Sequence, residues 1–144
     1  MQNKAVFAGF AIVVAGVIAA PAAFADSGQK SKAKLSGMNE VPKADPDGRG
    51  EATVTVWGSD VCWRIKVQKI APAAAAHIHA AVAGVNGPVV VPLTTPNADG
   101  WSAGCATVAA PLAANIAAHP EQYYVNVHNA AYPGGAVRGQ LGNH

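Results

Sequence analysis

Apolar and polar residues alternate along most of the chain after residue 25, which is the period of a β-strand with one buried face. The clearest case is the pair of runs EATVTVWG (51–58) and DVCWRIKVQ (60–68), which meet at Gly58-Ser59 and predict a hairpin. Turn-forming segments rich in Gly, Pro, Asn and Asp separate the predicted strands. Eight short strands of this kind indicate an antiparallel sandwich or a flattened barrel. The six further strands are expected at residues 32–38, 75–82, 87–93, 103–109, 122–129 and 135–141.

One segment departs from this period. In APLAANIAAHPEQ (110–122), Leu112, Ile116 and the alanines fall at helical spacing, and Pro120 follows as a stop signal. The sequence therefore predicts one short helix in an otherwise all-β chain.

The first 25 residues, MQNKAVFAGFAIVVAGVIAAPAAFA, combine an early lysine, an apolar run and an A-x-A ending. This is the pattern of a secretory signal peptide, with cleavage after Ala25 and a single domain at 26–144. An uncleaved N-terminal anchor is the alternative. No later apolar run is long enough to span a bilayer, so we expect a periplasmic or secreted protein.

The formal net charge of the whole chain is only +2, which gives no reason to expect nucleic acid or an anionic membrane as a partner. Three lysines cluster in GQKSKAKL near the expected mature N-terminus. We interpret this segment as a solvated lead-in to the domain rather than as a binding patch.

Cys62 and Cys105 are the only cysteines of the chain. In an exported protein two cysteines are expected to form a disulfide, because the compartment is oxidising. Thiolate ligation of a metal is the alternative, but there is no CxxC spacing and no histidine beside either cysteine.

The segment AHIHAAVAG (76–84) places two of the five histidines of the chain, His77 and His79, two residues apart. Side chains alternate between the faces of a strand, so both histidines share one face and Ile78 takes the core face. The same logic in YYVNVHN (123–129) and GAVRGQL (135–141) turns the valines inward. The side chains expected on the outer face are Tyr124, Asn126, His128 and Arg138.

Two imidazoles on one strand face and a third from another strand are the minimum set for a copper or zinc site. The alternative is that these are ordinary polar surface histidines with hydrogen-bonded neighbours. If the first strand passes the site, water, Met38 or Glu40 could supply a fourth ligand. The soft thioether of Met38 would favour Cu(I), and the carboxylate of Glu40 would favour harder divalent ions.

The segments LSGMNEVP (35–42), AHIHAAVAGVNGPVVVPL (76–93) and YYVNVHNAAYPGGAVRGQL (123–141) resemble the CHRD (chordin-type) domain of secreted bacterial proteins. The resemblance implies an antiparallel Greek-key-type β-sandwich, immunoglobulin-like or superoxide-dismutase-like in shape, in an extracytoplasmic setting. The chain departs from the family pattern at Ala80-Ala81, where the family often has Gly. Recurrent family residues correspond here to His77, His79, His128, Arg138 and Glu40.

Three functions follow from these observations. The first is extracytoplasmic copper binding by the three histidines, with zinc as the alternative ion and with Arg138 and Asn126 supporting the ligands. The second is a metal-free adhesion or interaction module, in which Trp57, Trp101 or Tyr124 would mark the contact surface. The third is a superoxide-dismutase-like copper enzyme in which Arg138 steers an anionic substrate. The sequence carries no hydrolase, phosphate-binding or haem-attachment motif that would favour other chemistry.

Overall fold

The computed structural model describes residues 28–143, so the predicted signal peptide at 1–25 lies outside the described residues. Residues 28–143 form eight strands and one α-helix, and each predicted strand overlaps an observed one. Two short 3-10 helices, η1 (Gly37–Asn39) and η2 (Pro120–Gln122), complete the secondary structure. The strands are β1 (Gln29–Ser36), β2 (Arg49–Trp57), β3 (Asp60–Gln68), β4 (Ala73–Ala80), β5 (Val89–Leu93), β6 (Trp101–Thr107), β7 (Tyr123–Asn129) and β8 (Val137–Gln140).

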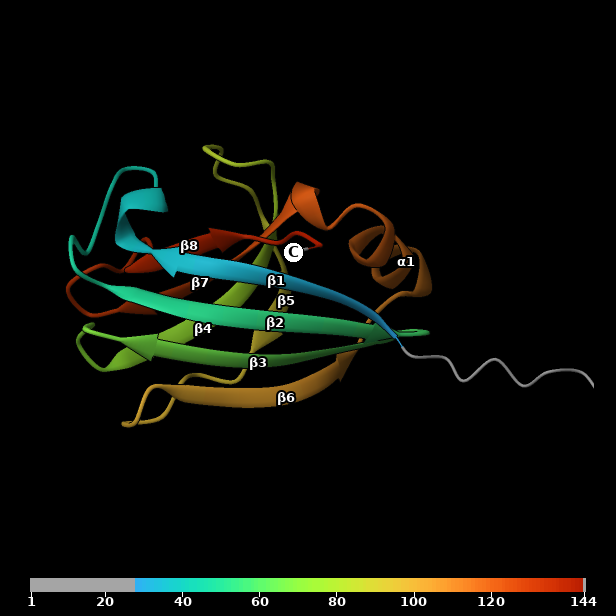
Figure 1. Cartoon of the computed structure of the whole chain (residues 1–144), viewed down its shortest axis with the longest axis horizontal. Helices are drawn as coiled ribbons and strands as arrows, with labels where there is room; N and C mark the ends of the chain where they lie inside the picture. The colour runs from blue at the N-terminus through green and yellow to red at the C-terminus, as the bar shows by residue number, and fades with distance from the viewer. Residues whose placement is uncertain (1–27, 144) are drawn as a thin grey trace, which may run out of the picture.

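The eight strands form one antiparallel sheet, in the order β5-β4-β7-β8-β1-β2-β3-β6, which nearly closes into a barrel. Figure 1 shows β1, β2, β3 and β6 as one layer in front of the other four strands. In backbone pairing the two halves meet at β1 and β8, through the pair Ser36 and Arg138, and at the bridge between Lys32 and Gly142. The all-β class and the antiparallel pairing are confirmed, and of the two expected architectures, a sandwich or a flattened barrel, the observed single sheet is close to the barrel. Alternation identifies the buried face of each strand but not its hydrogen-bonded neighbours.

The core fills the interior of this curled sheet. Ile78, Val125, Val127 and Val137 are all fully buried, which confirms the predicted inward positions on the histidine-bearing half. On the other half Trp63 is buried and donates its indole N–H to Ser102 Oγ at 3.1 Å. Because side chains alternate along a strand, burial of these apolar residues determines which side chains point outward.

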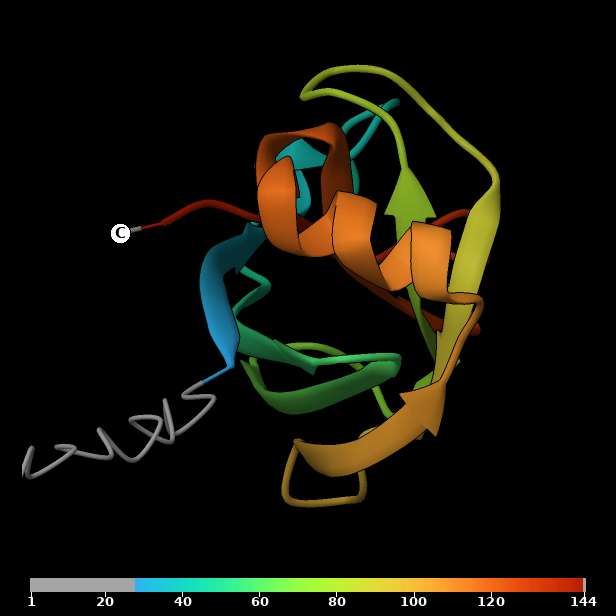
Figure 2. The ribbon, with the colours of Figure 1, turned by 90° about the vertical axis from the view of Figure 1, so that its right-hand side faces the viewer.

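Helix α1 (Ala110–Ala118) lies across one end of the barrel, as Figure 2 shows. Its own Ala113 and Ile116 are buried in the core, so the helix closes the end of the barrel that the strands leave open. It begins with Pro111 in its first turn, where the missing N–H costs nothing, and it ends before Pro120. The predicted helix is therefore confirmed.

Two further predictions are tested in the front layer of Figure 1. Gly58 has a φ of 55° in the two-residue turn between β2 and β3, and the predicted hairpin is confirmed. Cys62 and Cys105 face each other on β3 and β6 and form the predicted disulfide.

The lysine-rich segment was wrongly interpreted as a lead-in, because it forms β1, with Ala33 and Leu35 buried between exposed lysines. Within residues 28–143, no helix is long and apolar enough to cross a membrane.

Candidate metal centre

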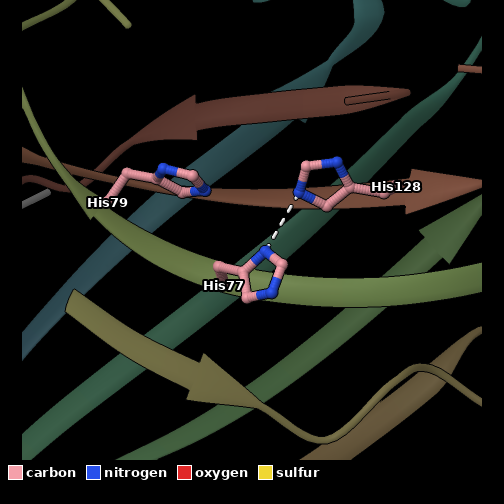
Figure 3. A group of neighbouring side chains, drawn as sticks. All are labelled: His77, His79 and His128. Atoms are coloured by element: carbon pink, nitrogen blue, oxygen red, sulfur yellow. Dashed lines mark hydrogen bonds between the residues drawn. The ribbon is translucent and has the colours of Figure 1, made fainter. Parts of the chain in front are cut away.

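The three strand histidines meet on the outer face of neighbouring strands β4 and β7. In the register of this pair, His77 lies opposite Asn126, His79 opposite Tyr124, and His128 opposite Ala75. The methyl group of Ala75 leaves room beside His128, so the imidazole can lean diagonally toward His77. Figure 3 shows the three rings turned toward a common point above the sheet.

The donor atoms of these rings are close enough to share one ion. One nitrogen from each of His77, His79 and His128 lies within 4.8 Å of the others. His77 Nδ1 and His128 Nε2 are 3.0 Å apart, the contact drawn as a dashed line in Figure 3. Three nitrogens at such separations can be ligands of one transition-metal ion.

Backbone carbonyls fix the orientation of two of the rings. His79 donates from Nδ1 to the carbonyl of Gly87 at 2.8 Å, and His128 donates from Nδ1 to the carbonyl of Pro133 at 2.9 Å. A carbonyl can only accept, so in both rings Nε2 carries the lone pair in the neutral form. This is the arrangement by which outer partners orient metal-binding imidazoles.

The Nε2 atom of His79 is the strongest local indication of a ligand. It is buried and has no hydrogen-bond partner within residues 28–143. Leaving a buried polar nitrogen unpaired costs free energy, so such an atom is expected to have a function or a ligand. A metal ion at the centre of the three rings would satisfy it.

Burial also favours the metal-binding protonation state. It lowers the pKa of His77, and neighbouring His128 and His79 lower it further by charge repulsion. Burial likewise lowers the pKa of His128, against the opposing effect of the Pro133 carbonyl. Neutral imidazole is the form that binds a metal, so both groups are prepared for ligation near neutral pH.

The histidines are more enclosed than a site on an open strand face would be. His79 is only 9% exposed, and His77 and His128 are half-buried. The loop at 81–88 brings Gly87 against His79, and the loop at 130–136 brings Pro133 against His128. The expected surface site is therefore recessed, because loops between strands pack over the outer face of β4 and β7.

Arg138 and Asn126 lie beside the histidines in the same row of the sheet. His77 is opposite Asn126, which is in turn opposite Arg138 on β8. Arg138 is 3% exposed and donates from Nε to Glu40 at 2.9 Å. Its remaining nitrogens donate to the carbonyl of Val85 and to the side chain of Asn86. Arg138 thus ties the loop at 81–88 to the segment that carries Glu40.

The two candidate fourth ligands lie differently. Glu40 is not in the group of donors formed by the three histidines, and its carboxylate is held by Arg138. Burial raises the pKa of Glu40, and the charge of Arg138 opposes that rise. Met38 is half exposed on η1, a helix that contacts β8.

Sequence reasoning missed several residues around the site. The ring of Tyr124 lies between His79 and Arg138, with the guanidinium carbon 4.0 Å from its centre. Asn86 accepts from Arg138 and donates to the carbonyl of Val41. The role of Tyr124 beside the histidines could have been inferred, since it shares the outward strand face with His128. The backbone carbonyl of Gly87, which accepts from His79, has no signature in the sequence.

Comparison with protein families identifies the domain. The model of the CHRD domain matches residues 31–141, which is most of the chain. The chain belongs to the CHRD domain family. The matched range of this CHRD domain contains all three histidines, Glu40 and Arg138. Comparison with curated proteins and with solved structures gives no match.

Proposed function

We propose that this CHRD domain protein binds copper through His77, His79 and His128 in the periplasm or outside the cell. The observation that carries the proposal is the convergence of three imidazole nitrogens around the buried, unpartnered Nε2 of His79. The disulfide between Cys62 and Cys105 is consistent with export to an oxidising compartment.

Copper is the ion that this donor set favours. Imidazole suits both copper and zinc, and the Irving–Williams order places Cu²⁺ above Zn²⁺ for a nitrogen site of given geometry. Water would complete the coordination, because Glu40 is engaged with Arg138. Met38 is the protein donor that we propose for Cu(I), and Asn126 and Arg138 would support the ligands from behind.

A superoxide-dismutase-like activity is less well supported than binding. In such an enzyme Arg138 would steer an anionic substrate to the metal, and this role requires a guanidinium that the substrate can reach. The side chain of Arg138 is 4% exposed and is paired with Glu40, so its charge is already compensated. We therefore favour copper sequestration or handling over catalysis.

The interaction module remains the alternative function. Trp57 and Trp101 are 41% and 53% exposed and could contribute to a contact surface. Tyr124 could not, since it is 2% exposed beneath the loops around the histidines.

The proposal is tested by the metal content and copper affinity of the protein purified without a histidine tag. We expect about one copper per chain for a site of this kind, lost in the His77→Ala/His79→Ala/His128→Ala variant. His119→Ala is the matched control, because His119 lies exposed after α1. If the unaltered protein and the triple variant bound copper equally weakly, and circular dichroism showed that the variant is folded, the copper site would be rejected and the interaction module would remain. A dismutation assay on the copper-loaded protein then separates binding from catalysis.

A further inference from the structure

Positive charge is concentrated on the outer face of the front layer in Figure 1, away from the histidines. Of the nine lysine and arginine side chains in residues 28–143, six lie on the outward positions of β1, β2 and β3. Only two carboxylates, Glu51 and Asp60, share these positions. The six cations are Lys30, Lys32, Lys34, Arg49, Arg64 and Lys66.

A groove of about 580 Å³ runs over this face. Short side chains, Thr53 and Thr55 on β2, form its floor. Thr53 lies between Lys32 on β1 and Arg64 on β3, so long cationic side chains flank it on both sides. Neighbouring strands are about 4.8 Å apart, which puts the backbones of Lys32 and Arg64 roughly 10 Å apart across the floor.

The cations of the groove are not neutralised from within the domain. Among residues 28–143, no carboxylate forms an ion pair with Lys30, Lys32 or Arg64. Glu51 lies one row further along the strands, between Lys34 and Lys66. Like charges gathered without counter-charges produce a local positive potential that attracts anionic ligands.

The groove also offers one aromatic surface. Trp57 is 41% exposed and lines the groove next to Thr55 along β2. An exposed indole stacks well on the apolar face of a sugar ring, and threonine hydroxyls can bond to sugar hydroxyls. Trp101, by contrast, already has Lys66 over its ring at 4.8 Å.

From these observations we propose that the outer face of β1, β2 and β3 binds an acidic polysaccharide along the groove. Single-stranded nucleic acid fits less well, because its binding sites present successive exposed aromatic platforms, whereas of the two indoles that line this groove Trp57 is exposed and Trp63 is buried. An anionic membrane fits less well, because Trp57 is the one exposed large apolar side chain among the residues that line the groove, and insertion needs a broader apolar surface.

The test is binding of the protein to polygalacturonate, with Lys32→Gln/Arg64→Gln as the groove variant. Lys43→Gln/Lys69→Gln is the matched control, because both lysines are exposed off this face and the loss of net charge is the same. We expect binding that weakens with salt, a roughly tenfold or greater loss in the groove variant and little change in the control. Trp57→Ala should weaken binding while keeping the salt dependence.

Three results would overturn the proposal. The first is no binding of polygalacturonate at low salt, and the second is an equal loss in the groove and control variants, which would indicate net charge alone. The third is tighter binding of a single-stranded oligonucleotide or of phosphatidylglycerol vesicles than of polygalacturonate. Thermal unfolding of each variant confirms that the fold is retained.

Discussion

The ring of Tyr124 lies flat against the ring of His79, with centroids 4.8 Å apart and planes 5° from parallel. The guanidinium of Arg138 covers the other side of Tyr124. The phenol oxygen also accepts the backbone N–H of Gly87, whose carbonyl accepts from His79. One tyrosine therefore supports the proposed ligand both through its ring and through the loop that orients it.

Tyr124→Phe is expected to weaken copper binding roughly tenfold, the lower end of the effect of losing an outer partner of a metal ligand. The ring stays, but the loop at 81–88 loses one anchor. Isothermal titration of the metal-depleted protein measures the change. Tyr123→Phe is the control, because it removes a phenol hydrogen bond to Asn115 on α1, away from the histidines. Equal affinities for the two variants would show that the anchor is irrelevant to the site.

Arg138→Met is expected to lower the free energy of unfolding by roughly 3–5 kcal/mol, because it leaves the buried carboxylate of Glu40 without its partner. Urea unfolding monitored by tryptophan fluorescence measures this loss. The double variant Glu40→Gln/Arg138→Met leaves no buried charge and should recover much of the stability. If the double variant were as unstable as the single one, lost packing rather than an unpaired charge would be responsible.

The metal-free protein should lose stability as the pH falls below about 6.5, the ordinary pKa of histidine. The pKa values of His77 and His128 are lowered in the folded state. The unfolded chain then takes up protons that the folded chain does not, so acid favours unfolding. Urea unfolding between about pH 8 and pH 5 measures the dependence. His77→Gln/His128→Gln should flatten it, and an unchanged slope in that variant would assign the effect to other groups.

Cys62→Ala/Cys105→Ala should cost roughly 2–4 kcal/mol of stability without changing copper affinity. The disulfide joins β3 and β6, whereas the histidines lie on β4 and β7 in the other half of the sheet. Chemical unfolding and copper titration of the same variant separate the two effects. A parallel fall in copper affinity would mean that the two halves are coupled through the core.

The sequence predicted most of what regular alternation determines. The positions of Ile78 and Val125 toward the core, and hence the outward face of His77, His79 and His128, follow from a period of two. The disulfide between Cys62 and Cys105 was predicted from the number of cysteines and from the oxidising compartment expected for an exported protein. Alternation left a sandwich and a flattened barrel both open, because the link of Ser36 to Arg138, which makes the eight strands one sheet, joins strands that are distant in the sequence.

The surroundings of the histidines were harder to predict. Glu40 was considered as a ligand, but its position in the sequence does not reveal that a buried Arg138 would hold it. The three lysines of GQKSKAKL were interpreted as a solvated lead-in rather than as part of a binding patch for a related reason. Lys32 and Arg64 lie 32 residues apart, and only the register of β1, β2 and β3 brings them to one row. The near-neutral net charge of the whole chain hides this local concentration.

The central claim is tested most directly by X-ray absorption spectroscopy of the protein loaded with one equivalent of Cu²⁺, beside His79→Gln and His119→Gln. We predict three imidazole nitrogens around the ion in the unaltered protein and in His119→Gln, and two in His79→Gln. An ion with no more than one imidazole ligand, or one whose spectrum does not change in His79→Gln, would contradict the account.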